Sequence, residues 1–361
     1  TLSGNDTLVH YQQVLDSVAY SSTSQNPTNN LADLTRTISL QVSDGANSSS
    51  IQTETVNVLE ILTVSSGTLN IGNISATVAS LTQSGGTLTG SGIVTASGAM
   101  TWSGGNETGT GQTIVQGNVT ITNQVGIDDG RVVELHGTNS TLAANASINL
   151  NPTGTGNAAA GVLSNVSGAT LSITGDGASI FTQNFGGADN GVSARFDNAG
   201  TVQKTAGTGT STIGVQFNNT GTVDVQSGTL TLSGGGTNKG ALKADGGNLI
   251  VGGSSVGGSA LITGSSRLEF TGSNDATAVT FAPSASGILQ LDNLSFTGQI
   301  RGLAGPETIN LVGINGNTLV TKSFNPKTGV LTLSDGSHSA TLNIVGDFSF
   351  APVTINGIAS T

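Results

Sequence analysis

Apolar and small polar residues alternate over short stretches along most of this 361-residue chain. The segment Thr229-Leu230-Thr231-Leu232, for example, places leucine at every second position with threonine between. A period of two predicts β-strands that bury one face and expose the other. Glycine and asparagine interrupt the pattern after a few residues, which indicates short strands and many turns. The pattern therefore predicts an all-β protein.

One phrase returns at a nearly constant spacing. Residues 196–202 (Phe-Asp-Asn-Ala-Gly-Thr-Val) are followed 21 residues later by 217–223 (Phe-Asn-Asn-Thr-Gly-Thr-Val), and a weaker copy begins at Asn238. A unit this short cannot bury its own apolar face, so it must stack on its neighbours. Coils of about 20 residues accommodate three short strands and three turns. The repeat predicts a parallel β-helix, a solenoid.

The spacing also predicts which residues lie above one another on adjacent coils. The expected core pairs are Phe196 with Phe217 and Val202 with Val223. Asparagines at one corner are expected to form an internal ladder in which each amide bonds to the next coil, as in other stacked-strand structures. The expected ladder consists of Asn198, Asn219 and Asn238.

Three regions of the chain differ in composition and sequence pattern. Residues 1–62 contain little glycine and include a strand pattern in 34–45, followed by another from Thr53 to Val58. Residues 63–265 form the repetitive body. In residues 266–361 phenylalanine and proline return, and 328–344 predict a hairpin about an Asp-Gly turn. Because the last coil of a solenoid exposes apolar core and strand edges, we expect this third region to be a cap.

Several segments resemble parts of large bacterial surface adhesins. Residues 11–20 (Tyr-Gln-Gln-Val-Leu-Asp-Ser-Val-Ala-Tyr) and 36–45 (Arg-Thr-Ile-Ser-Leu-Gln-Val-Ser-Asp-Gly) resemble the second half of their cadherin-like repeats. The Gly-Gly-Thr-Leu-Thr-Gly-Ser-Gly segment from Gly85, residues 101–106 and the phrase at 217–223 resemble their β-strand-repeat regions. The third region is similar to the terminal module of those regions. The resemblance implies a right-handed parallel β-helix, preceded by part of a β-sandwich spacer.

The N-terminal region is too short for a complete sandwich, which needs about seven strands and ~100 residues. Apolar residues of its strands would lie on an open face, and such faces and unpaired edges rarely stay exposed. The residues concerned are Val14, Val18, Ile38, Leu40 and Val42. Two alternatives remain open. Residues upstream of Thr1 complete the domain, or another copy completes it by strand addition and so builds a head-to-tail filament.

The composition excludes several classes of function. Ten Lys and Arg against 21 Asp and Glu give a net charge of −11, and no basic patch is present, which argues against nucleic-acid binding. The chain contains no cysteine, which excludes disulfides and thiolate metal sites. No apolar run approaches the ~18 residues of a membrane-spanning helix. Since the chain begins with Thr1 and has no signal segment, we expect it to start inside a longer protein or after processing.

Candidate catalytic chemistry is sparse. Parallel β-helices include polysaccharide lyases and epimerases, whose sites need clustered carboxylates. The densest polar cluster is Asp128-Asp129-Gly130-Arg131 with Glu134 and His136. We expect a solvated corner with an Asp-Gly turn rather than an active site. The three histidines are far apart in sequence, and no cofactor or metal centre is predicted from them.

Two weaker ligand candidates remain. Residues 44–47 (Asp-Gly-Ala-Asn) could supply oxygen ligands to Ca²⁺, although a turn is the simpler interpretation. Trp102, the single tryptophan, could form an exposed platform for a glycan, although a core position is the simpler interpretation.

Together these features predict an extracellular bacterial protein at the cell surface: a solenoid stalk of an adhesin, a biofilm matrix protein or a surface fibre. Its partners would be further copies of itself and surface glycans. The alternatives are a polysaccharide-active β-helix enzyme and a glycan-binding adhesin head.

Overall fold

The computed structural model describes residues 7, 9–10, 12–13, 35–41, 43, 46–57, 60–253, 257–273, 275–346, 354–355 and 358–359. Contacts divide the chain into two compact units, Thr1–Glu60 and Ile61–Thr361. This division lies within two residues of the boundary expected after residue 62.

The first unit contains an antiparallel hairpin of β1 (Thr35–Leu40) and β2 (Gln52–Asn57). The two strands expected from alternation in this region are thus confirmed. Of the apolar residues expected on an open face, Ile38 is half-buried and Leu40 is 47% exposed. The other three (Val14, Val18 and Val42) lie outside the described residues.

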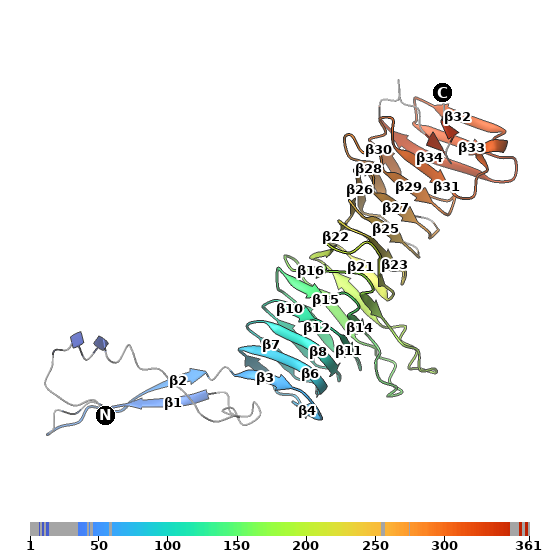
Figure 1. Cartoon of the computed structure of the whole chain (residues 1–361). Helices are drawn as coiled ribbons and strands as arrows, with labels where there is room; N and C mark the ends of the chain where they lie inside the picture. Colours follow the sequence, from blue (N-terminus) through green and yellow to red (C-terminus); the bar gives the residue numbers. More distant parts are fainter. Residues whose placement is uncertain are drawn as a thin grey trace. The chain divides into compact units, whose positions relative to one another are not determined.

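The second unit is a parallel β-helix of about 12 turns, drawn as the stack of arrows in Figure 1. The predicted fold class is therefore confirmed. At the usual strand separation of about 4.8 Å, 12 coils extend for about 55 Å. Two sheets run the length of the stack, and a third accompanies only part of it.

The first sheet begins with β3 (Ile61–Val64) and the N-terminal halves of β6 (Ser80–Thr89) and β8 (Met100–Glu107). It continues with β10 (Val119–Ile121), β13 (Ser140–Leu142), β16 (Thr170–Ile173), β19 (Thr201–Lys204), β22 (Thr222–Val225), β24 (Ala241–Asp245), β26 (Ser259–Thr263), β28 (Ala278–Phe281) and β30 (Gln299–Arg301).

The second sheet begins with β4 (Thr68–Asn70) and the C-terminal halves of β6 and β8. It continues with β11 (Gln124–Ile127), β14 (Ser147–Asn149), β17 (Ser179–Phe181), β20 (Thr210–Ile213), β23 (Thr229–Leu232), β25 (Asn248–Val251), β27 (Arg267–Phe270), β29 (Ile288–Leu291) and β31 (Thr308–Leu311).

The third sheet has seven strands and ends part-way along the stack. Its strands are β5 (Ala76–Val78), β7 (Ile93–Ala96), β9 (Gln112–Val115), β12 (Val132–Leu135), β15 (Val162–Asn165), β18 (Arg195–Asn198) and β21 (Gln216–Asn219). Beyond β21 a single bridge, from Asn219 to Asn238, continues this side. The coils therefore have three sheets up to β21 and two thereafter.

Register in the core follows the repeated phrase. Val202 is paired directly with Val223, and Phe196 with Phe217. The two phenylalanine rings meet edge to face with centroids 5.2 Å apart, and all four side chains are buried. The predicted core pairs are confirmed. Alternate residues of these strands face inward, so each coil adds a layer to one continuous apolar core.

The glycine of the phrase is fixed by the approach of neighbouring coils. A Cβ on Gly221 would lie 2.0 Å from the carbonyl oxygen of Gly200, and one on Gly240 would lie 2.1 Å from that of Gly221. No side chain fits at such distances. The repeated glycine therefore reflects close backbone packing at one corner.

The C-terminal boundary differs from the expectation. Parallel coils continue past residue 265, because β27 pairs with both β25 and β29, and the stack reaches β30 and β31. Phe270 and Phe281, which we expected in a cap, are buried core residues of these coils. Alternation in this part is as regular as before, but glycine-rich phrases no longer mark the coils.

A cap does follow, but it is shorter than expected. A 3₁₀ turn (Gly316–Thr318) leads to β32 (Thr321–Asn325), β33 (Val330–Ser334) and β34 (Ser339–Val345). These three strands are antiparallel, and β34 pairs in parallel with β30 of the last coil. Short strands β35 (Thr354–Ile355) and β36 (Ile358–Ala359) continue from β31. The predicted hairpin within 328–344 is confirmed.

Candidate functional site

Two long loops interrupt the repeat and project from the solenoid. Residues 150–161 leave the second sheet after β14, and residues 182–194 leave it one coil later, after β17. Figure 1 shows both as extended green loops on one side of the stack. We call them the loop pair. Because loops on a rigid scaffold commonly carry binding residues, the loop pair is the first candidate site.

Two aspartates at the corner of the preceding coil hold the first loop. Asp128 accepts hydrogen bonds from the backbone N–H of Thr153, at 2.8 Å, and from its hydroxyl. Asp129 accepts from the Thr155 hydroxyl, at 2.9 Å, and from the Asn157 amide, at 3.3 Å. These carboxylates position a loop of the neighbouring coil.

The Asp-Gly turn itself is as predicted, but it is not solvated. Asp129 and Gly130 have φ values of 56° and 84°, and the N–H of Arg131 donates to the carbonyl of Asp128 at 3.0 Å. Asp128 is only 1% exposed. Burial raises the pKa of the Asp128 carboxyl, although hydrogen bonds from Thr153 and Asp129 oppose the shift. The expectation of a solvated corner was therefore wrong for Asp128.

A third aspartate joins the two loops. Asp189, 3% exposed, accepts from the Asn151 amide at 2.8 Å and from the N–H of Gly156 at 2.9 Å. The Ser193 hydroxyl donates to the carbonyl of Ala158 and accepts from the N–H of Ala160, both at 2.8 Å. The loops are thus bound to each other by side chains of the second loop.

The outer surface of the second loop contains exposed apolar side chains. Phe185 is 48% exposed and Val192 is 77% exposed. The ring of Phe185 lies over Gly154 of the first loop, where a Cβ would be 3.1 Å from its Cδ1 atom. The glycine leaves room for the ring. The pair therefore presents an exposed aromatic ring, whereas the carboxylates of Asp128 and Asp189 that hold the loops are buried.

The polar cluster predicted around Asp128 is divided by the fold. Arg131 turns into the core, where its Nε donates to Glu107 at 2.9 Å and its Nη2 donates to the Thr113 hydroxyl at 2.8 Å. Arg131 and Glu107 side chains are both 0% exposed. His136 and Glu134 instead form a partly exposed pair at 3.3 Å. Neighbouring residues of one strand point to opposite faces, so the cluster does not converge on one site.

A second buried charge lies at a corner of the sixth and seventh coils. Lys204 is 0% exposed and donates to the Asp176 carboxylate at 2.9 Å and to the carbonyls of Gly175 and Ala206. This bond from Lys204 lowers the pKa of Asp176. All three ammonium hydrogens have acceptors, which is the condition for burying a lysine.

Trp102 lies in the core with 0% exposure, paired with Gln83 and Ile121 in the first sheet. The alternative of an exposed glycan platform at Trp102 was wrong. Alternation places Thr101 and Ser103 outward and the indole inward, since only a buried position removes its large apolar surface from water.

The predicted asparagine ladder is confirmed and is longer than expected. The amide of Asn198 donates to Asn219 at 2.7 Å, and that of Asn219 donates to Asn238 at 2.8 Å. Asn165 precedes them and donates to Asn198 at 2.7 Å. All four side chains are buried. Asn165 was not expected in the ladder, because the second loop lengthens its spacing to Asn198 to 33 residues.

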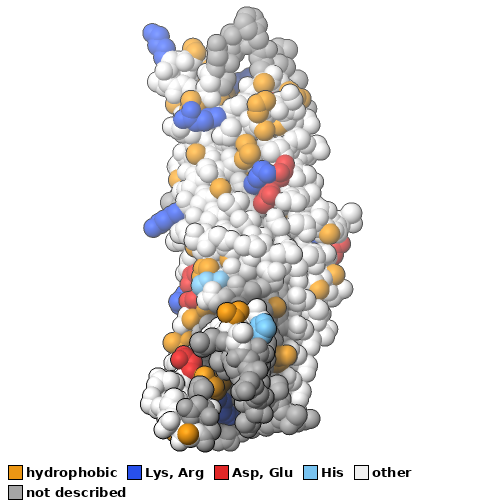
Figure 2. Space-filling model, turned by 90° about the vertical axis from the view of Figure 1, so that its left-hand side faces the viewer, with side chains coloured by type: hydrophobic (Ala, Val, Ile, Leu, Met, Phe, Trp, Pro, Cys, Tyr) orange, Lys and Arg blue, Asp and Glu red, His pale blue; other side chains and the backbone are white. Residues whose placement is uncertain are grey.

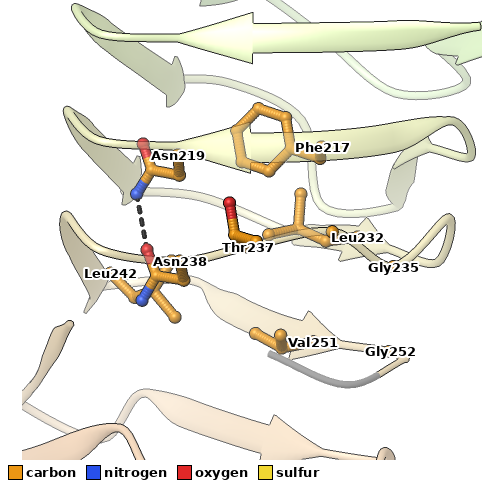
Figure 3. A pocket seen from close by; sticks show the side chains of 10 residues that line it. Phe217, Asn219, Leu232, Gly235, Thr237, Asn238, Leu242, Val251 and Gly252 are labelled. Atoms are coloured by element: carbon orange, nitrogen blue, oxygen red, sulfur yellow. Dashed lines mark hydrogen bonds between the residues drawn. The ribbon is translucent and has the colours of Figure 1, made fainter. Parts of the chain in front are cut away.

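A small cavity marks the end of the third sheet, shown in Figure 3. It lies between Phe217, Leu232 and Asn238 and has a volume of about 20 Å³. This volume holds about one water molecule and no larger ligand. The ladder bond between Asn219 and Asn238 crosses the same region.

The described part of the chain holds no group of three or more His, Asp and Glu side chains arranged to bind a metal. Asp44 and Gly45 of the expected Ca²⁺ segment lie outside the described residues. Among the residues that the structure describes, no helix has the length and apolar character to cross a membrane.

Comparison with known proteins yields no match to any family model, characterised protein or solved structure. The functional assignment therefore depends on the geometry described above.

Proposed function

We propose that this chain is an extracellular structural protein whose solenoid is a shaft in an adhesin, a biofilm matrix protein or a surface fibre. One observation carries the proposal. Backbone pairing is continuous from coil to coil, from β3 to the cap strand β34, without a disulfide. Such a stack holds its two ends apart at a set distance. A spacer needs this property, and a soluble enzyme does not.

The surface is consistent with this role. Charged residues make up 9% of the sequence, and Figure 2 shows only scattered charged side chains on the face that it presents. The buried Arg131 is paired with Glu107 inside the core, and the buried Lys204 with the partly exposed Asp176. A surface of this kind exposes few sites to proteases that need flexible or charged segments.

Limited proteolysis of the full chain tests the shaft. Thermolysin is expected to cut within the first unit and the loop pair while the coils from β19 to β31 survive as one fragment. Exposure on cells that produce the protein can be tested by labelling with a membrane-impermeant reagent. Rapid digestion between β19 and β31, or labelling only after lysis, would contradict the proposal.

We also propose self-association between ends of the molecule. The hairpin of the first unit exposes Leu40 (47%) and Ile51 (60%), and every residue of β32 in the cap is exposed. Exposed strands of this type add to one another through backbone hydrogen bonds. Electron microscopy of the intact chain should show filaments that deletion of residues 1–60 abolishes. Single particles of the intact chain at high concentration would contradict this part of the proposal.

Ligand recognition by the loop pair is the second candidate function, favoured by the exposure of Phe185 (48%), which directly follows the exposed residues Gln183 and Asn184. An aromatic ring with adjacent amides is suited to a sugar face. A glycan array with the intact chain and with Phe185→Ala tests it. Equal signals from both proteins would exclude the loop pair.

A further inference from the structure

Five threonines form a straight row on the outer face of the first sheet. Thr63 is paired with Thr82, Thr82 with Thr101, Thr101 with Thr120, and Thr120 with Thr141. The pairing is direct in each case, so the side chains repeat at the strand separation of about 4.8 Å. Thr63, Thr101 and Thr120 are exposed, and the other two are half-buried. The row spans five consecutive coils.

A second line of hydroxyls accompanies the first. Two residues after four of the threonines stand Ser65, Ser84, Ser103 and Thr122. Residues i and i+2 of a strand point to the same side and are about 6.6 Å apart, and this holds for Ser84 in β6 and Ser103 in β8. Ser65 and Thr122 directly follow the ends of β3 and β10. A register shift after Gln83 displaces part of this line relative to its neighbour. We call these nine residues the hydroxyl face.

Among the described residues, the hydroxyls of this face have no hydrogen-bond partner in the protein. In the described part of the chain, no hydrogen bond joins any of the nine hydroxyl groups to another protein group. Serines elsewhere in the same coils behave differently. Ser97, for example, donates to the carbonyl of Val78 at 3.0 Å. The nine hydroxyls are therefore free to bond to water or to a ligand.

The hydroxyl face is uncharged, whereas charged residues occur farther along the same row. Residues 61–65, 80–84, 99–103, 118–122 and 139–143 contain no Asp, Glu, Lys or Arg.

The seventh to ninth coils provide the contrast. There the row continues as Gln203, Asp224 and Lys243, and the ammonium of Lys243 lies 3.7 Å from the Asp224 carboxylate. Charged groups orient water around themselves. The first five coils lack this disturbance, although their strands belong to the same parallel sheet.

We propose that the hydroxyl face binds ice. The threonine repeat along the stack is slightly longer than the a-axis repeat of hexagonal ice, and the spacing across the strand is slightly shorter than the c-axis repeat. Threonine keeps few χ1 rotamers, so the hydroxyls and methyl groups are held in place before binding. Water bonded to such an array takes up a spacing close to that of the crystal.

The composition of the face favours ice over a protein or a glycan. Protein interfaces depend on Trp, Tyr and Arg anchors, and the five segments of the face contain one such residue, Trp102, which is buried. The same burial leaves no exposed aromatic ring to stack on a sugar. An uncharged array without such anchors, with one threonine in each of five consecutive coils, fits a crystalline lattice of water.

Partition into ice tests the proposal on the full chain. A dilute solution is frozen slowly around a cold finger, and the protein in the ice is compared with that in the liquid. The intact chain should be enriched in ice relative to albumin and should slow recrystallisation in a frozen sucrose film. Thr101→Lys and Thr120→Lys should each abolish both effects, because a long charged side chain holds the lattice away.

A matched control is available on another face of the same coils. Thr95 is half-buried on the outer side of the third sheet, and Thr95→Lys should retain the full effect. Circular dichroism and thermal unfolding establish that each variant is folded, and Thr120→Val serves if a lysine variant is not. Exclusion of the intact chain from ice would overturn the proposal. So would equal partition of the hydroxyl-face and Thr95 variants. A dimer at 4 °C that Thr120→Lys dissociates, without partition into ice, would assign the face to packing between copies instead.

Discussion

The asparagine ladder offers the sharpest test of how the coils are held in register. Asn219 occupies the middle of the four-residue ladder, accepting from Asn198 and donating to Asn238. Replacing Asn219 by alanine removes both bonds. It leaves a buried donor on one side and a buried acceptor on the other.

The expected loss of stability follows from these two unpaired groups. A buried polar group left without a partner costs about 1–3 kcal/mol. The Asn238 oxygen loses its donor entirely, whereas the Asn198 amide keeps longer contacts of 3.3 Å to the carbonyls of Gly200 and Thr222. We therefore expect Asn219→Ala to destabilise this region by about 2–4 kcal/mol. Gln216→Ala, at an exposed position of the same strand, should change it by less than about 0.5 kcal/mol.

Native-state hydrogen exchange is the suitable assay, since a solenoid need not unfold in one step. Peptides covering β21, β22 and residues 235–242 should lose protection in Asn219→Ala, whereas peptides covering β3 to β8 should not. Asn198→Ala and the double variant complete a cycle. Because the two residues share a bond, their effects should be non-additive by about 0.5–3 kcal/mol. Additive effects of the two substitutions, or a loss of protection no larger than that in Gln216→Ala, would refute the ladder as a stabilising network.

Three further predictions concern other parts of the stack. Glu107→Gln should destabilise the third and fourth coils by about 3–5 kcal/mol, because the buried Arg131 loses its counter-charge. Urea unfolding followed by Trp102 fluorescence measures this destabilisation, and an unchanged unfolding midpoint would contradict the prediction. Gly221→Ala should be more damaging than Gly214→Ala, since the Cβ of the first would lie 2.0 Å from a backbone oxygen, while that of the second would lie no closer than 3.6 Å to any atom. Equal thermal unfolding midpoints for the two variants would count against the close packing of coils. Hydrogen bonds from the N–H groups of Asn315, His338 and Ser337 lower the pKa of Asp335 below its ordinary value of 3.8, so its contribution to the cap is present above pH 3.8 and is lost as the pH falls further. Exchange in β33 and β34 should therefore accelerate below that pH in the intact chain but not in Asp335→Asn.

Several features followed from the sequence because they depend on neighbours along the chain. Alternation fixed the strands, and the phrase repeated at 196–202 and 217–223 fixed the register of one coil on the next. Once Phe196 lies above Phe217, every residue of the phrase has its partner, and the ladder from Asn198 to Asn238 is a consequence. A solenoid makes such inference effective, because contacts between coils occur at a nearly constant sequence separation.

The dependence on a constant separation between coils also explains which features the sequence did not predict. An insertion of a dozen residues breaks the constant separation, so Asn165 could not be aligned with Asn198 although the two amides are bonded. The loop pair itself depends on contacts between Asp189 and residues more than 30 positions earlier. The end of the coils at residue 265 was misplaced because a change in composition is not a change in backbone pairing.

Which charges lie inside was decided by tertiary structure alone. Arg131 and Glu134 belong to one polar segment, yet one is in the core and the other is on the surface. Arg131 is tolerated inside because Glu107, 24 residues earlier, meets it there. Local sequence determines that successive strand residues face opposite ways, but only the assembled coil determines whether a buried charge finds its partner. The free energy of the Arg131–Glu107 pair depends on the distance between two coils, and the sequence of a single coil does not specify that distance.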